Sequence, residues 1–300
     1  MNQRRILYVP GMKPKPPAEW HERMLLRCLL TGLRRTDPVV AAELETAREV
    51  FSLVPWPHLF YTEVKDTAID APGLDRLLAL PAPEARDIEE ARHWQKQLAR
   101  FAYLACDALP WLTRWIADPN VKATLQDSLR YLENRDGIAA RIRELVAEAL
   151  QAAAEGGRPV LLIAHSLGSV IAWDVLWSLS RQRSGPAAVD FLTLGSPLGL
   201  NFFRHRLLGA RAEGRARYPD NIRHWINLSA IGELTALDRR FADDYAPMLR
   251  LGLLDSITDE TELYNYFRGA EGLNVHKCYG YLVNPHTAAA VADWWRRAQD

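Results

Sequence analysis

The sequence is poor in cysteine, and its few cysteines are not arranged as disulfide partners. Cys28, Cys106 and Cys278 are the only three among 300 residues, and they lie far apart. An odd, widely spaced set does not provide the disulfide framework of a small secreted domain. We therefore expect a protein of a reducing compartment and predict a cytoplasmic location.

The chain also lacks an excess of charge of one sign and a convincing membrane segment. Its 37 Lys and Arg residues balance 37 Asp and Glu residues, so we expect no nucleic-acid partner. The apolar run at 6–9 is too short for a signal peptide. The longest apolar stretch, 160–179, contains His165, Ser166 and Asp174. A strand that runs into a buried helix explains it better than a membrane span, so we expect no integral membrane segment.

Cofactor motifs are missing as well. No Gly-x-x-x-x-Gly-Lys-Ser/Thr phosphate loop occurs, and no Gly-x-Gly-x-x-Gly follows a predicted strand. His276, Cys278 and His286 do not have the spacing of a structural zinc site. We expect neither a metal nor a cofactor.

What the sequence does contain is an alternation of apolar strands and amphipathic helices. Continuous apolar or β-branched runs predict strands at about 5–9, 49–54, 159–164, 189–194 and 222–228. Helical periodicity predicts helices at about 18–33, 122–131, 138–154, 166–179 and 287–298. Such alternation predicts a single α/β domain with a mostly parallel sheet and helices on both faces.

The segment from about 61 to 120 interrupts this alternation. It is rich in proline and contains two apolar helical patches, 88–109 and 111–116, without a strand pattern. We interpret it as a helical cap inserted into the domain. Aromatic side chains in and before this segment could line an apolar acyl pocket or form the core of the insertion: Trp56, Phe60, Tyr61, Trp94, Phe101, Trp111 and Trp115.

The most informative segment is VLLIAHSLGSVIAWDVL, residues 160–176. A strand ends at Ala164, Ser166 occupies the turn, and a helix begins at once. The small residues Ala164 and Gly168 permit a sharp turn that exposes the serine hydroxyl above the sheet edge. The Leu167 amide would lie at the helix N-terminus, where it could stabilise an oxyanion. Ser166 is therefore the candidate nucleophile, and a serine that merely caps a helix is the alternative.

With these residues the chain resembles the α/β-hydrolases of the lipase/esterase-like kind. It has His-Ser-Leu-Gly at the turn, and Ala164 stands in place of the first glycine of Gly-x-Ser-x-Gly. The resemblance covers most of the chain apart from the insertion. It implies that the acid and the histidine follow the serine in the order Ser, Asp/Glu, His. It also implies that the strand at 5–9 corresponds to the family's third strand and that the sheet has about six strands.

That order leaves two of the eight histidines as candidate bases. His276 precedes the predicted terminal helix and is followed by Tyr281-Leu282, as is common in the family. His286 stands at the start of that helix, where capping or surface exposure explains it. We predict His276 as the base and keep His286 as the alternative.

The resemblance places the acid after the strand at 222–228. Glu233 follows Gly232 and resembles the acid segment of related hydrolases, with Glu in place of Asp, and Asp238 is the alternative. The second oxyanion donor is expected to be the backbone amide of Met12, since Pro10-Gly11 replaces the family's His-Gly pair.

A second serine, Ser196, lies in the similar pattern Gly-Ser-Pro-Leu-Gly. Because proline follows it instead of a helix, we predict a turn at the pocket rim and not a nucleophile.

These residues predict the hydrolysis of a carboxylic ester, or of a thioester, through an acyl-enzyme with a Ser166–His276–Glu233 triad. The expected substrate is a small-molecule ester with an apolar acyl group. Two alternatives stay open: a non-catalytic binding or scaffold protein on this fold, and an amidase or acyltransferase.

Overall fold

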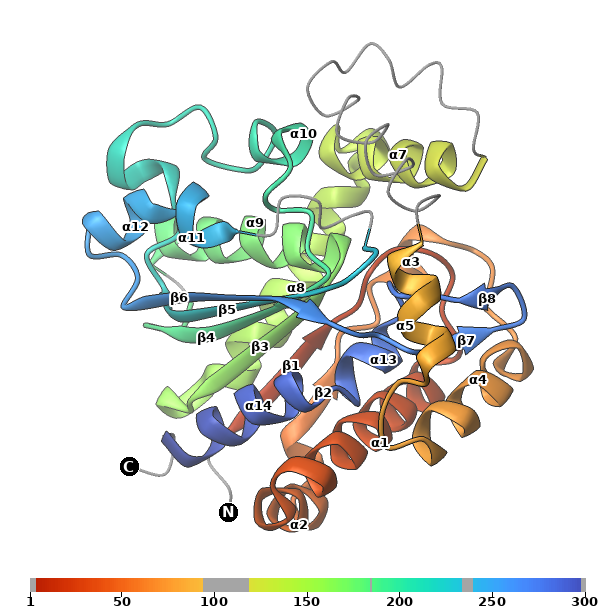
Figure 1. Ribbon diagram of the computed structural model, residues 1–300. Coiled ribbons are helices and arrows are strands. Elements are labelled where there is room, and N and C mark those ends of the chain that lie inside the picture. Colours follow the sequence, from red (N-terminus) through yellow and green to blue (C-terminus); the bar gives the residue numbers. More distant parts are fainter. Residues whose placement is uncertain (1–3, 94–118, 184, 234–239, 298–300) are drawn as a thin grey trace.

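The structure is a computed structural model that describes residues 4–93, 119–183, 185–233 and 240–297. At its centre lies a parallel sheet with the strand order β2-β1-β3-β4-β5-β6 (Figure 1). A separate antiparallel pair is formed by β7 (Arg268–Gly269) and β8 (Gly272–Leu273). The six strands of the main sheet are β1 (Arg5–Val9), β2 (Phe51–Leu53), β3 (Val160–His165), β4 (Val189–Leu194), β5 (Ile222–Ala230) and β6 (Ser256–Leu263).

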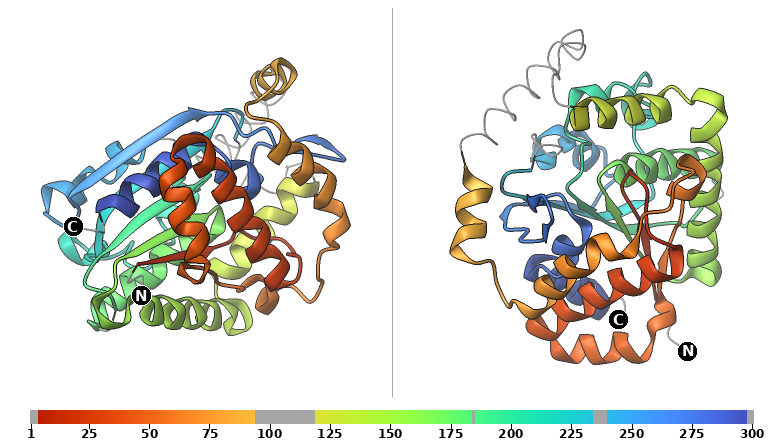
Figure 2. Two further views of the ribbon diagram at one scale, coloured as in Figure 1. Left: turned by 90° about the horizontal axis from the view of Figure 1, so that it is seen from below. Right: turned by 90° about the vertical axis from the view of Figure 1, so that its right-hand side faces the viewer.

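Helices cover both faces of this sheet (Figure 2), which confirms the α/β fold class expected from the sequence. In the described part of the chain, no helix is both long enough and apolar enough to cross a membrane. The α-helices are α1 (Ala18–Thr36), α2 (Pro38–Thr46), α3 (Pro57–Phe60), α4 (Thr67–Ala79), α5 (Ala85–Arg92), α7 (Pro119–Leu132), α8 (Ile138–Ala154), α9 (Leu167–Gln182), α10 (Asn201–Arg204), α11 (Phe241–Asp244), α12 (Ala246–Arg250), α13 (Cys278–Leu282) and α14 (Pro285–Arg297).

The inner strands are largely apolar because most of their residues are buried on both faces, and β3 shows this most completely. Every residue of β3 is buried, and successive side chains point to opposite faces. Leu162 and Ala164 join the hydrophobic core that α8 and α9 cover, whereas Leu161 and Ile163 join the core on the other face, against α1 and α14. Each face thus has a core of its own, and together they keep the sheet rigid.

Some elements differ from those expected, each for a local reason. β2 is shorter than predicted because Arg48–Val50 forms a 3₁₀ turn before it. α2 was not expected; Pro38 occupies its first turn, and the Asp37 carboxylate accepts a hydrogen bond from the Val40 amide at 3.3 Å. β6 was also missed, because this edge strand is largely polar and only one of its residues is buried.

Where the structure describes it, the segment interpreted as a helical insertion contains the two helices α4 and α5, joined by loops. α4 begins after Asp66, whose carboxylate accepts a hydrogen bond from the Ala68 amide at 2.9 Å. α5 begins after Glu84 with a capping box formed with Asp87. The predicted helical patches beyond α5 lie outside the described residues, as do Trp94, Phe101, Trp111 and Trp115.

Candidate active site

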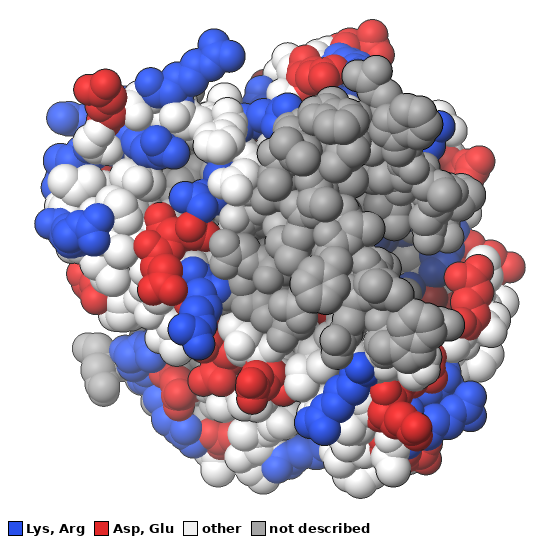
Figure 3. All heavy atoms as spheres, turned by 45° about the horizontal axis from the view of Figure 1, so that its top comes forward, with Lys and Arg blue, Asp and Glu red and all other residues white. Residues whose placement is uncertain are grey.

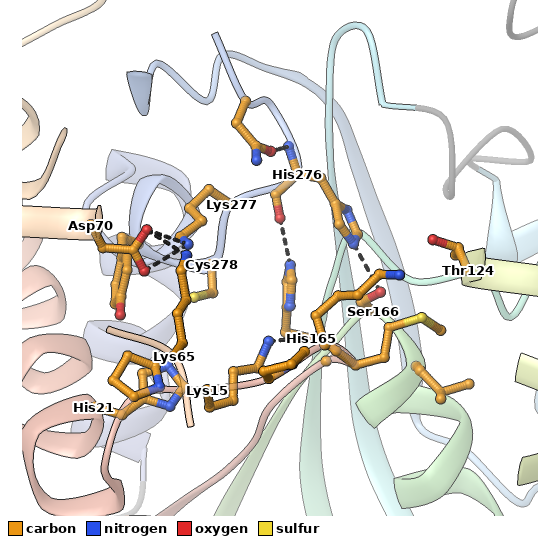
Figure 4. Close-up of a pocket in the computed structure, with 18 of the residues that line it drawn as sticks. Lys15, His21, Lys65, Asp70, Thr124, His165, Ser166, His276, Lys277 and Cys278 are labelled. Carbon is orange, nitrogen blue, oxygen red and sulfur yellow. Dashed lines mark hydrogen bonds and ion pairs between the residues drawn. The ribbon is translucent and has the colours of Figure 1, made fainter. Parts of the chain in front are cut away.

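The candidate residues converge because parallel strands end at one edge of the sheet. Met12 follows β1, Ser166 follows β3 and Glu233 follows β5, all at the carboxyl ends of these strands. His276 lies just before α13. At this edge a cavity of about 290 Å³ is lined in part by Met12, Ser166, Leu167 and His276 (Figure 4).

Ser166 has an unusual backbone conformation. Its φ of 53° and ψ of −130° lie in a region that residues other than glycine seldom adopt. Such strain costs about 1–3 kcal/mol and tends to occur at functional sites. The Ser166 amide donates to the Leu194 carbonyl at 3.0 Å, and the Ser166 carbonyl accepts from the Ser169 amide at 2.9 Å. Its hydroxyl makes no capping hydrogen bond to α9, so Ser166 is not an ordinary N-cap.

Close backbone packing holds this turn against the loop after β1. A Cβ atom on Gly168 would lie 2.5 Å from the carbonyl oxygens of both Val9 and Pro10. A Cβ atom on Gly11 would lie 2.8 Å from the Ser166 Cβ. Glycine at both positions therefore lets the two loops touch, and this contact brings the chain near Met12 to the Ser166 hydroxyl.

Gly168→Ala is expected to destabilise the fold, because the new methyl group would press on two backbone oxygens that cannot rotate away. Overpacking of this kind costs about 1–3 kcal/mol, or roughly 2–4 °C in Tm per kcal/mol for a chain of this size. Thermal unfolding measures the effect. Gly269→Ala is the matched control, because its Cβ would meet only one atom, at 3.8 Å. A Tm for Gly168→Ala equal to that of the control would contradict the close approach.

Three side chains form one hydrogen-bonded relay. The His276 Nε2 lies 2.8 Å from the Ser166 Oγ, and the His276 Nδ1 lies 2.9 Å from the Glu233 Oε2. A carboxylate can only accept, so Nδ1 carries the proton and Nε2 accepts the serine hydroxyl. Glu233 is 1 % exposed, which keeps this acceptor away from bulk water.

Tyr281 and Gly195 fix the position of the Glu233 carboxylate. The Tyr281 hydroxyl donates to Glu233 Oε2 at 3.0 Å and accepts from the Ala230 amide at 3.0 Å. Gly195, with a φ of 53°, leaves the room that the relay needs, since a Cβ there would lie 3.1 Å from Glu233 Oε2 and 3.2 Å from His276 Nδ1. The family resemblance pointed to Tyr281 only as a residue that follows the histidine, and its contact with Glu233 is seen in the structure alone.

His165, next to Ser166, supports the backbone of His276. Its Nε2 donates to the His276 carbonyl at 2.8 Å, and the two imidazole rings lie 4.7 Å apart. Burial, and then the nearby His276 and Lys15, hold the pKa of His165 well below its ordinary value, so this ring is neutral. His165 therefore positions the backbone of His276 and does not compete with it for the serine proton.

Ser196 lies beneath the turn at Ser166, and its side chain does not line the cavity. Ser196 is fully buried, and its Oγ lies 2.6 Å from the Ser169 Oγ. The Ser169 hydroxyl donates to the Ser166 carbonyl at 2.6 Å, so the Ser196 hydroxyl donates to Ser169. The turn that contains Ser196 reaches the cavity through Pro197, as expected, but the Ser196 side chain points into the protein.

The two candidate oxyanion donors, Met12 and Leu167, both line the cavity. Leu167 is the first residue of α9, where amides have no acceptor within the helix. The loop of Met12 is tied down twice. Lys15 Nζ donates to the Met12 carbonyl at 2.6 Å, and Trp56 Nε1 donates to the Pro10 carbonyl at 2.7 Å.

The aromatic residues before the insertion do not line the cavity. Trp56 and Phe60 are buried in the core under α8, where their rings meet edge to face with centroids 6.0 Å apart. Tyr61 packs against the same core and donates to Asp127 at 2.8 Å. These three residues therefore belong to the main core of the domain and form neither the lining of the cavity nor a core of the insertion's own.

The alternative site residues are not brought to Ser166. His286 lies in the first turn of α14, and its half-exposed side chain lies 3.7 Å from Glu260 on the edge strand β6. Asp238 lies outside the described residues. Within the described ranges, no group of three or more His, Cys, Asp or Glu side chains is placed to hold a metal ion.

Comparisons of the chain with family models, with curated proteins and with solved structures find no match.

Proposed function

We propose that this chain is a serine hydrolase of the α/β-hydrolase type that cleaves an ester or thioester through an acyl-enzyme. The observation that carries the proposal is the continuous relay from Ser166 Oγ through His276 to Glu233, with hydrogen bonds of 2.8 and 2.9 Å. A serine hydroxyl needs a base within hydrogen-bond reach and an acid that orients the base. The strained backbone of Ser166, at the carboxyl end of β3, supports the same reading.

In the acylation step, the Ser166 oxygen attacks the carbonyl carbon of the ester while His276 Nε2 takes the hydroxyl proton. Glu233 stabilises the imidazolium that forms and holds it in the required tautomer. Negative charge develops on the carbonyl oxygen, and the amides of Leu167 and Met12 are the proposed donors to it. When the tetrahedral intermediate collapses, His276 returns the proton to the leaving alcohol or thiol, and the acyl group remains on Ser166.

In the deacylation step, water replaces the leaving group. His276 takes one proton from the water, and the resulting hydroxide attacks the acyl carbon. Collapse of the second tetrahedral intermediate releases the acid and returns the proton to Ser166. Next to Ser166 the cavity presents apolar side chains of Met12, Leu167 and Phe203, which suit the uncharged part of a small ester.

A fluorophosphonate probe tests this proposal without knowledge of the substrate. The probe should label Ser166 with a stoichiometry near one, and peptide mapping should locate the adduct. His276→Ala should abolish labelling, because the serine then lacks its base. His286→Ala is the matched control and should label as the unmodified chain does. Adducts on another residue, or full labelling of His276→Ala, would overturn the assignment.

A further inference from the structure

The cavity beside Ser166 has a cationic end that the proposed reaction does not use. Lys15, Lys65 and Lys277 line it together with a single carboxylate, Asp70. In the view of Figure 4, the three lysines lie on one side of His165, and Ser166 and the imidazole of His276 lie on the other. Both groups belong to one cavity, so a small ligand could touch both.

Distant segments of the chain build this cationic end. Lys65 and Lys277 both reach Asp70 at 2.8 Å. The Lys65 amide donates to the Lys15 carbonyl at 3.0 Å, which ties these two loops together. Lys277 Nζ also lies 5.3 Å from the ring centroids of both Phe267 and Tyr279. The lysines are therefore held in place and are not loose surface side chains.

The positive charge here is only partly compensated. Asp70 is buried and pairs with two of the three ammonium groups. Lys15 donates instead to the Met12 carbonyl, a neutral acceptor, and in the described part of the chain it has no carboxylate within ion-pair distance. Burial lowers the pKa of Lys15 to about 8, and Lys277 and Lys65 add to this effect against the opposing Cys278 and Asp70. Burying a cation partly without a counter-ion costs free energy, and an anionic ligand at this end of the cavity would offset that cost.

The distribution of lysines in this chain also supports an anion-binding role for this end of the cavity. Only six of its 37 basic residues are lysines, and four of those six line this one cavity: Lys13, Lys15, Lys65 and Lys277. The rest of the protein carries its positive charge mainly on arginine. On the face seen in Figure 3, basic and acidic side chains are interspersed, whereas the cationic end of the cavity has three lysines and one carboxylate. The lysine ammonium is a compact point charge with three hydrogen-bond donors, which suits an anionic oxygen group.

Resting on the proposed hydrolase function, we propose that Lys15, Lys65 and Lys277 form a subsite for an anionic group of the substrate, a carboxylate or a phosphate. The ester carbonyl lies at Ser166 while the anionic group lies at the lysines. The substrate is then a small ester that carries a negative charge, and not a wholly apolar acyl ester as the sequence suggested. His21 lines the same end of the cavity and offers a further polar contact. Burial, and then the nearby Lys15 and Lys277, hold the pKa of His21 well below its ordinary value, so its imidazole is neutral.

Matched pairs of chromogenic esters test this charge preference. On the acyl side, the mono-4-nitrophenyl ester of glutaric acid is compared with the corresponding ester of glutaric monoamide, which has the same shape without the charge. A phosphonate in place of the carboxylate distinguishes the two anionic groups. On the alcohol side, 4-acetoxybenzoate is compared with 4-acetoxybenzamide, with rates normalised to hydrolysis by hydroxide. For at least one pair, kcat/KM for the anionic member should be about tenfold higher or more, as for a hydrogen bond to a charged group.

Lys15→Met removes one charge without leaving Asp70 unpaired, and Lys65→Met is the second variant. Each should reduce the ratio of anionic to neutral kcat/KM by about tenfold. Lys122→Met, at an exposed position on α7, is the matched control and should leave the ratio unchanged. Thermal unfolding checks that each variant is folded. A ratio near one in the unmodified chain for both pairs, or the same ratio in the lysine variants, would overturn the subsite.

Direct binding separates this inference from the hydrolase proposal. Glutarate and inorganic phosphate are titrated calorimetrically into the unmodified chain and into Lys15→Met. If no ester is hydrolysed but either anion binds and the variant binds it about tenfold more weakly, the subsite stands and the hydrolase proposal fails. If neutral esters are hydrolysed but neither anion binds and charge has no effect, the hydrolase proposal stands and the subsite is wrong.

Discussion

Ser166→Ala is expected to lower kcat for ester hydrolysis by on the order of 10⁴-fold or more, as when a nucleophile is removed from a comparable triad. Without Oγ the acyl-enzyme cannot form, and His276 loses the hydroxyl that now lies 2.8 Å from its Nε2. The residual rate would come only from binding and from the oxyanion donors. Initial rates with a neutral chromogenic ester measure the effect, and fluorophosphonate titration counts the active sites.

The control for Ser166→Ala is Ser180→Ala, in the last turn of the same helix α9, where the hydroxyl donates to the Trp177 carbonyl at 2.8 Å. It should keep full activity. Preparations must exclude trace esterases, because a contaminant at one part in 10⁴ would mask the predicted loss. Undiminished turnover by pure Ser166→Ala would show that another group performs the chemistry.

Glu233→Gln is expected to reduce kcat by about 10³–10⁴-fold while the fold is retained, as in a comparable triad whose aspartate became asparagine. The carboxylate accepts from His276 Nδ1 at 2.9 Å and so leaves Nε2 free to take the serine proton. A glutamine can present its NH₂ group to Nδ1, which favours the opposite tautomer and places a hydrogen on Nε2. It also removes the negative charge that stabilises the imidazolium. Steady-state kcat and the rate of fluorophosphonate labelling should fall together.

Two further variants calibrate the effect of Glu233→Gln. Glu262→Gln changes an exposed carboxylate on the edge strand β6 and should leave kcat unchanged. Tyr281→Phe removes one donor to Glu233 Oε2 but keeps the carboxylate, so its kcat should lie between those of the other two. Near-normal kcat in Glu233→Gln would mean that Glu233 is not the orienting acid, and Asp238 would then be the residue to change.

The inner strands could be read from the sequence because their signal is local. β1, β3 and β4 are mainly apolar runs because most of their residues are buried, and β1 and β4 were predicted at their observed bounds. β5 is more polar, but its apolar residues are frequent enough to indicate a strand. β6 was not predicted because this edge strand is largely exposed, so that the polar sequence of Ser256–Leu263 resembles that of a loop. Its place in the sheet depends on pairing with β5, a contact that no local pattern encodes.

Parts of the site were readable for the same reason. The strand–serine–helix pattern around Ser166 requires small residues within two positions of the serine, and Ala164 and Gly168 are visible in the sequence. The partners that tune the site come from far along the chain: His165 supports His276 over 111 residues, and Tyr281 holds Glu233 over 48. Both residues stand in segments that carry the family resemblance, but those segments do not indicate which distant residue each side chain contacts.

By itself the sequence determined the α/β class and the sharp turn at Ser166, because hydrophobic period and turn chemistry act over a few neighbouring residues. His276 and Glu233 became candidates for the relay only through the resemblance to the α/β-hydrolases. Only the tertiary structure decided that His276 and not His286 meets Ser166, that Trp56 and Ser196 are buried supports, and that Lys15, Lys65 and Lys277 share one cavity. The physical reason is that hydrogen bonds and charges act over a few ångströms in space. Which distant residues come that close depends on how the loops at the carboxyl edge of the sheet pack.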